Sequence, residues 1–128
     1  MDRYVYYDPN PVNHGRVGDC VVRALSKALG QTWERTYWDL CDEGFYFGDW
    51  GSSDAVWSAY LHSKGFSRHA VPAEYSGRYT VEDFAKDHPF GTYVLWIGGH
   101  VVCVKDGSYF DSWRSGSEIP HLYWEKEG

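Results

Sequence analysis

The sequence predicts an α+β fold, with helices in the first part of the chain and strands in the last. Between residues 19 and 87, apolar side chains recur at helical spacing and follow Asp, Ser or Thr residues that can cap a helix. From residue 92 onward, β-branched and aromatic runs are separated by Gly-Gly and Asp-Gly turns, which are typical of hairpins. This order indicates an N-terminal helical half packed on a C-terminal antiparallel sheet. A chain of 128 residues suits one domain, which we expect to span 1–128.

The first helix is expected over residues 19–29, after an irregular, turn-rich lead-in. Asp19 is a good N-cap, which puts Cys20 in the first helical position, and Gly30 ends the helix. Its inner face is formed by Val21, Ala24, Leu25 and Ala28. A cysteine in this position is either a small packed residue or a reactive thiol, because a helix N-terminus favours the thiolate.

Three further helices are expected before residue 92. The second begins after Thr32, ends at Gly44 and places Trp33, Tyr37, Leu40 and Cys41 on its inner face, which makes Cys41 a core residue. The next covers residues 54–64, and the stretch Thr80–Asp83 has the capping-box pattern of a short fourth helix. The aromatic segment 44–53 is either a surface lip or a buried plug.

Strands are expected at 92–97, 100–105 and 108–113, with a final one at 121–126 and an earlier one at 66–71. A two-residue loop at Asp106-Gly107 pairs Val104 with Tyr109 and Cys103 with Phe110, and places Asp111 opposite Val102. His100 then shares a face with Asp111, within reach of its carboxylate, whereas Cys103 points to the other face.

This pattern is chemically suggestive when Cys20 is added to it. A carboxylate beside an imidazole stabilises the imidazolium, which in turn favours a neighbouring thiolate. Each residue also has an ordinary explanation: Cys20 as a packed residue, His100 as a core histidine and Asp111 as a turn cap. Two rivals exist in His69 and Asp106, but the glycine after Asp106 identifies it as a turn residue.

Three segments in this order resemble the papain-like cysteine peptidase superfamily, and most closely its compact bacteriocin-leader-processing type from bacteria and phages. The stretch GDCVVRAL resembles the nucleophile segment, GGHVVCV the histidine strand and YFDSW the strand with the third member. The resemblance implies a papain-like fold with Cys20 as nucleophile, His100 as general base and acid, and Asp111 as the residue that orients His100.

The resemblance also suggests which residues hold the oxyanion and the substrate. Such peptidases use a Gln shortly before the nucleophile, and here that place is taken by His14, with Asn13 beside it. We expect the Asn13 amide and the Cys20 backbone N–H to bind the oxyanion. His14, Asp19, Trp50 and Trp113 complete the set of candidate oxyanion and substrate residues.

Three classes of function remain open on this basis. The first is a peptidase or isopeptidase that cleaves an amide bond of a peptide or protein through a thioester acyl-enzyme. The second is an acyl or amide transferase that uses the same triad, with an amine in place of water. The third is a catalytically inactive papain-like module that binds a partner, such as a phage or bacterial accessory factor.

Composition argues against other classes. The net charge is −6, and no Lys/Arg run is longer than two, so a nucleic-acid or anionic-membrane partner is not expected. The longest strongly apolar run, 93–97, is too short for a membrane span, and the first residues do not resemble a signal peptide. Three cysteines without C-x-x-C spacing favour a reducing, cytoplasmic setting. No metal or organic cofactor is expected, and the oligomeric state is left open.

Overall fold

The computed structural model describes residues 2–15, 17–75 and 77–127, and within them four α-helices and one short 3-10 helix form. These helices are α1 (Cys20–Leu29), α2 (Trp33–Phe47), α3 (Asp54–Ser63), η1 (Ala73–Tyr75) and α4 (Val81–Asp87). Helix α1 ends at Gly30, whose positive φ of 64° suits a glycine cap. The capping box predicted for α4 is present, with the Thr80 and Asp83 side chains each accepting a backbone N–H of the other residue.

The strands of the described residues form one six-stranded sheet with the order β1-β5-β4-β3-β6-β2. The strands are β1 (Tyr4–Tyr6), β2 (Phe66–Ala70), β3 (Thr92–Trp96), β4 (Val101–Lys105), β5 (Ser108–Asp111) and β6 (Leu122–Lys126). All neighbours are antiparallel except β1 and β5. Nothing in the sequence pattern predicts β1, because a strand of three residues is too short to show an alternation.

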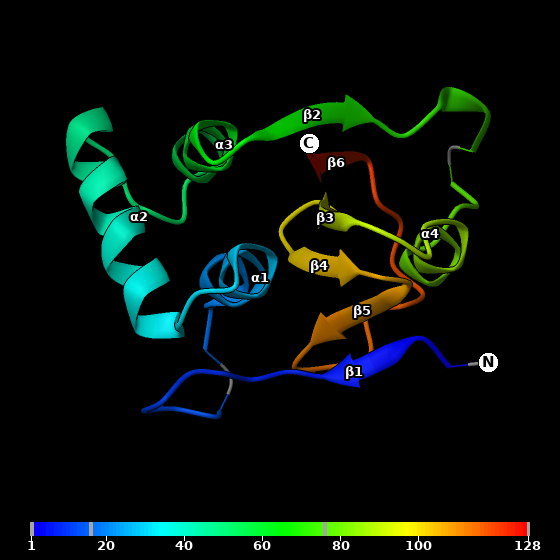
Figure 1. Ribbon diagram of the computed structural model, residues 1–128, viewed down its shortest axis with the longest axis horizontal. Helices are drawn as coiled ribbons and strands as arrows, with labels where there is room; N and C mark the ends of the chain where they lie inside the picture. The colour runs from blue at the N-terminus through cyan, green and yellow to red at the C-terminus, as the bar shows by residue number, and fades with distance from the viewer. Residues whose placement is uncertain (1, 16, 76, 128) are drawn as a thin grey trace.

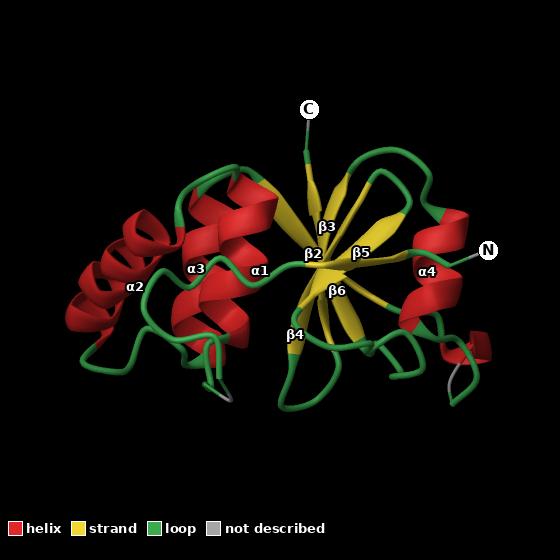
Figure 2. Ribbon diagram, turned by 90° about the horizontal axis from the view of Figure 1, so that it is seen from below, coloured by secondary structure: helices red, strands yellow, loops and turns green. Residues whose placement is uncertain are grey.

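The sheet lies between two groups of helices (Figure 1, Figure 2). Helices α1, α2 and α3 are on one side of it, with α1 nearest to the strands, and α4 is on the other side. The fold is therefore mixed α+β, as expected from the sequence. Helix α1, which begins at Cys20, packs directly against β4, which begins just after His100. The two residues are therefore brought close together.

Two apolar clusters hold these layers together, one on each face of the sheet. The larger joins α1, α2 and α3 to the sheet, with Leu25, Leu40, Trp57 and Cys103 among its members. The smaller joins α4 to the other face of the central strands, and it contains Val102 and Val104. Alternate residues of β4 thus enter opposite clusters, as the period of a strand requires.

The hairpin between β4 and β5 has the predicted register. Val104 pairs with Tyr109 and Cys103 with Phe110, so the loop consists of Asp106 and Gly107. Both have positive φ, 49° and 83°, which is the geometry of a type I′ turn. The Asp106 side chain also accepts the Gly91 backbone N–H at 3.0 Å, which explains this residue as a structural one.

Helix α2 differs from its prediction in length. It continues through Gly44, the expected end, and stops at Gly48. Gly44 is required for a different reason, because a Cβ there would lie 2.5 Å from the Asp49 carbonyl oxygen of the returning chain. A glycine therefore marks a close backbone approach here and does not mark a helix end.

The inner face predicted for α2 is confirmed at Leu40 but wrong at Tyr37 and Cys41, which are exposed. Thr36, Leu40 and Gly44 are the buried residues of this helix, whereas Cys41 is exposed. The aromatic segment that follows is exposed too: Phe45 and Trp50 retain 86% and 81% of their accessible surface. The buried-plug interpretation of residues 44–53 is thus excluded, because the aromatic rings of this segment point to solvent and only Gly44 is buried.

Two further properties follow from the described part of the chain. None of its helices combines the length and the apolar character that crossing a membrane requires. Within the same residues, no group of three or more His, Cys, Asp or Glu side chains is arranged to hold a metal ion.

Cys103 and Cys41 provide a matched test of this packing. Cys103 is fully buried in the larger apolar cluster, so Cys103→Ser places a hydroxyl where no water can solvate it. We expect this change to lower the free energy of unfolding by about 2 kcal/mol in urea titrations. The same substitution at the exposed Cys41 should cost less than about 0.5 kcal/mol. Equal effects of the two substitutions would contradict the assigned faces.

Candidate active site

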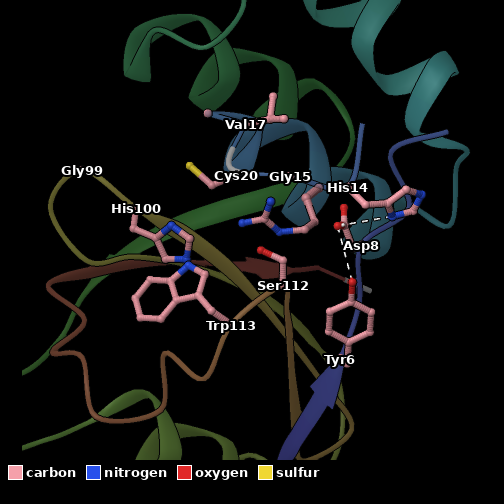
Figure 3. A pocket seen from close by; sticks show the side chains of 12 residues that line it. Tyr6, Asp8, His14, Gly15, Val17, Cys20, Gly99, His100, Ser112 and Trp113 are labelled. Atoms are coloured by element: carbon pink, nitrogen blue, oxygen red, sulfur yellow. Dashed lines mark hydrogen bonds and ion pairs between the residues drawn. The ribbon is translucent and has the colours of Figure 1, made fainter. Parts of the chain in front are cut away.

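Cys20 and His100 lie in the same surface hollow, which has a volume of about 830 Å³. Cys20 is the first residue of α1, and His100 lies directly before β4. Figure 3 shows the sulfur and the imidazole on the same side of the hollow, turned toward one another. The turn formed by Gly98 and Gly99, both with positive φ, leads into His100 and sets its position.

His100 is held by Asp111 on one side and by an aromatic ring on the other. Its Nε2 atom is 2.7 Å from Asp111 Oδ2. The ring of Trp113 lies against the imidazole, with 4.8 Å between the ring centres. Since Nε2 is engaged by the carboxylate, Nδ1 is the ring nitrogen left to interact with Cys20.

Asp111 is fully buried, and its carboxylate accepts four hydrogen bonds. Its Oδ2 atom accepts from His100 and, at 2.6 Å, from the Ser115 hydroxyl. Its Oδ1 atom accepts from the Ser112 backbone N–H at 2.8 Å and from Arg23 Nη2 at 3.0 Å. A carboxylate with this many donors is favoured in its ionised form. The pKa of Asp111 is accordingly lowered: burial raises it, but the hydrogen bond and charge of His100, with Ser115 and Arg23, outweigh the burial.

Arg23 connects the Asp111 carboxylate of the sheet to α1, the helix that begins at Cys20. Its side chain is only 5% exposed, and it donates to Asp19 Oδ1 at 2.6 Å as well as to Asp111. Asp19 in turn accepts the indole N–H of Trp33 at 2.9 Å. The result is a buried chain of opposite charges, Asp19–Arg23–Asp111, which extends from the start of α1 to the end of β5.

The thiol and the imidazole each shift the pKa of the other in the direction that favours a thiolate–imidazolium pair. Burial raises the pKa of the Cys20 thiol, but the hydrogen bond and charge of His100, the Val101 N–H and the charge of Arg23 together lower it below its ordinary value. For His100, burial lowers the pKa, while Asp111 and Cys20 raise it to a net value of about 9. Both directions favour a thiolate beside an imidazolium at neutral pH.

Cys103 shows what the same side chain does without such partners. It lies in the apolar cluster between α1 and the sheet, with no charged partner beside it among the described residues, and burial raises the pKa of its thiol to about 12. Position, and not residue type, therefore makes Cys20 the reactive candidate.

The start of α1 also provides hydrogen-bond donors next to the sulfur. The N–H groups of Cys20 and Val21 are in the first turn, where no intrahelical acceptor exists. Donors at a helix N-terminus can stabilise a negative oxygen that develops on a carbonyl bound at the sulfur.

Of the remaining candidate residues selected from the sequence, some line the hollow and others lie outside it. His14 and Trp113 line the hollow, whereas Asn13 and Trp50 do not. The side-chain amide oxygen of Asn13, Oδ1, accepts the Gly15 backbone N–H at 2.8 Å and so stabilises its own turn. Trp50 lies in the turn after α2. The expectation that Asn13 and Trp50 contribute to the site is not supported by their positions.

Asp19 was expected to cap α1 and to contribute to the oxyanion or substrate site, and its contacts give it a different role. It directly precedes α1 but makes no side-chain capping bond, and as a buried residue it does not line the hollow. Its carboxylate is turned toward Arg23 and Trp33 because their buried N–H groups need an acceptor. The rival His69 lies on β2, at the edge of the sheet opposite to β1 and β5, where it contacts Tyr123 and Glu125.

Several residues of the site could not be selected from the sequence. Ser115 and the tyrosines that bind the Asp111 carbonyl, Tyr4 through its hydroxyl and Tyr7 through its N–H, have no recognisable motif. Arg23 has one signal, its i, i+4 spacing from Asp19 on a helix. That spacing is common on solvated faces, so it does not by itself indicate a buried pair.

Comparison with known proteins adds no relative: no family model matches the chain, and no curated protein or solved structure shows significant similarity to it.

Arg23→Gln should destabilise the protein strongly. It leaves the Asp19 and Asp111 carboxylates buried without their cation, which typically costs about 3 kcal/mol or more in the free energy of unfolding. Arg35→Gln is the matched control, since Arg35 pairs with Asp39 on the exposed surface of α2 and should cost no more than about 0.5 kcal/mol. Urea unfolding of both variants measures the difference. A loss for Arg23→Gln as small as that for Arg35→Gln would show that the buried pairs do not hold the site together.

Asp111→Asn should lower the pKa of His100 and raise that of Cys20. The carboxylate is the main group that raises the imidazole pKa, and a weaker imidazolium supports the thiolate less. NMR titration of the His100 ring and the pH dependence of Cys20 alkylation measure the two shifts. Asp106→Asn is the control, because Asn before Gly also suits the turn. The assignment of Asp111 fails if Asp106→Asn, and not Asp111→Asn, changes the His100 titration.

Proposed function

We propose that this chain is a cysteine peptidase of papain-like type that cleaves an amide bond of a peptide or protein through a thioester acyl-enzyme. The observation that supports this most directly is the Asp111–His100 contact of 2.7 Å beside the Cys20 thiol, in a hollow large enough for a substrate. The raised pKa of His100, about 9, and the lowered pKa of Cys20 provide a nucleophile and an acid in the same pair.

In the proposed acylation step, the Cys20 thiolate attacks the carbonyl carbon of the scissile amide. The carbonyl oxygen becomes negative and is stabilised by the N–H groups that open α1. His100 then gives its proton to the leaving nitrogen as the C–N bond breaks. An amine and a thioester to Cys20 result, and the imidazole is left neutral.

In the proposed deacylation step, neutral His100 takes a proton from water, and the resulting hydroxide adds to the thioester. The C–S bond breaks, the carboxylic acid product leaves, and the thiolate–imidazolium pair is restored. Asp111 remains ionised throughout, holding His100 in orientation and stabilising its charged form.

We propose the cytoplasm as the setting of this activity. Cys20, Cys41 and Cys103 are all free thiols, and a thiolate nucleophile needs a reducing environment to persist.

Alkylation of the three cysteines tests the proposal before any substrate is known. At mildly acidic pH, iodoacetamide should modify Cys20 at least tenfold faster than the exposed Cys41, because only Cys20 has an imidazolium that favours its thiolate. Peptide mapping by mass spectrometry gives the rates, and His100→Ala should abolish the difference. Modification of Cys20 no faster than Cys41 would refute the proposed nucleophile.

A fluorogenic peptide-amide library then tests turnover. A substrate cleaved by the wild type and not by Cys20→Ala should show kcat/KM that falls above pH 9, as His100 loses the proton required by the leaving group. Rapid Cys20 alkylation together with no cleavage of any library member would contradict the peptidase assignment.

A further inference from the structure

One carboxylate of the described residues lines the hollow itself, away from Cys20 and His100. Asp8 follows β1 by two residues, and its side chain is only 6% exposed although it lines the hollow. Among the described residues, its contacts are long: the Tyr6 hydroxyl donates to Oδ2 at 3.5 Å, and His14 Nδ1 is 3.4 Å from the same oxygen. Both contacts fall on Oδ2, as the dashed lines of Figure 3 show. A buried carboxylate is stabilised by closer and more numerous donors than these.

The other charged groups in the described lining of the hollow are already compensated. Arg23 is paired with both Asp19 and Asp111, so its guanidinium has two carboxylates for one positive charge. His100 is paired with Asp111 and with the thiolate of Cys20. Among the described residues, Asp8 is the one carboxylate of the lining, and its one ionisable contact is His14, whose side chain is 61% exposed.

From this arrangement we infer that Asp8 and Tyr6 form a subsite for a cationic group of the substrate, a Lys or Arg side chain. A primary ammonium or guanidinium can replace His14 at the carboxylate and form a charge-assisted hydrogen bond in a site of low exposure. The Tyr6 ring lines the hollow next to Asp8 and offers an aromatic surface for the methylene stem and the charge.

The subsite lies across the hollow from Cys20 and His100. Its assignment to a substrate side chain rests on the function proposed above. Figure 3 places Cys20 and His100 at one side of the hollow and Asp8, His14 and Tyr6 at the other. A peptide whose carbonyl lies at the Cys20 sulfur therefore reaches Asp8 with a nearby residue of its chain. The same chemistry is offered by a free amino terminus, and the experiment separates these two sources.

The test uses peptidyl chloromethyl ketones, which alkylate Cys20 and require no known substrate. Tri-alanine probes, each made with an acetylated and with a free amino terminus, receive Lys, norleucine or Glu at one of the three positions. The second-order rate of Cys20 alkylation is measured by intact mass. Norleucine has the alkyl stem of Lys without its charge. At the position that reaches Asp8, we expect Lys to react at least tenfold faster than norleucine, and Glu to react more slowly.

Matched variants identify the carboxylate responsible. Asp8→Asn should reduce the ratio of Lys to norleucine rates to about one, and Asp8→Glu should restore most of it. Asp42→Asn removes the same charge from the exposed surface of α2 and should leave the ratio unchanged. If Asp8→Asn does not fold, Asp8→Ser is measured in its place, with the same expected ratio of about one.

The outcomes are distinct from a failure of the proposed function. Cys20 that no probe alkylates faster than Cys41 refutes the nucleophile, whatever the charge of the probe. Rapid alkylation with equal rates for Lys and norleucine at every position, or a Lys preference that persists in Asp8→Asn, refutes the subsite alone. A preference for a free amino terminus over its acetylated form, with no preference for Lys, refutes the side-chain assignment.

Discussion

The buried guanidinium of Arg23 is the interaction on which the geometry of the site depends. It joins Asp19, at the start of the helix that contains Cys20, to Asp111, at the end of β5. Taking three charges out of water is costly, and the cost is offset only when each group is paired and fully hydrogen-bonded. That condition is met here, since no buried side-chain polar atom of the described residues lacks a partner. The helical half and the sheet half are therefore held in one relative position by a polar contact as well as by the apolar cluster beneath it.

The same network determines the charge state of the reacting groups. For Cys20, His100 and Asp111 alike, burial is the largest single influence and disfavours the charged form. In each case the combined hydrogen bonds and opposite charges are larger, so all three pKa values move toward ionisation. A thiol that is buried without such partners behaves as Cys103 does, with its pKa raised to about 12.

The hollow is completed by the segment before α1, which has little regular structure. Strand β1 pairs with β5 and brings Tyr4 and Tyr7 onto the Asp111 carbonyl, so Asp111 is held by its backbone as well as by its side chain. The chain then continues past Asp8 toward Cys20 and lines the hollow on the way. The part of the chain with the fewest local signals thus both supports Asp111 and carries the subsite proposed for the substrate.

The sequence by itself determined the features that depend on near neighbours. The span of α1, the capping box of α4 and the Asp106-Gly107 hairpin are all set by residues within one or two turns of each other. The hairpin register alone was enough to bring His100 and Asp111 to one face, because the period of a strand is two.

Tertiary structure decided what depends on contacts between distant segments. The inner face of α2 was wrong at Tyr37 and Cys41. The sequence does not show that the returning chain packs against Gly44, and this packing decides which side of the helix is buried. Arg23 and Asp8 are ordinary charged residues in the sequence, and only burial beside particular partners gives them a role. Local patterns follow from backbone geometry, whereas the environment of a charge is set by whichever segments fold around it.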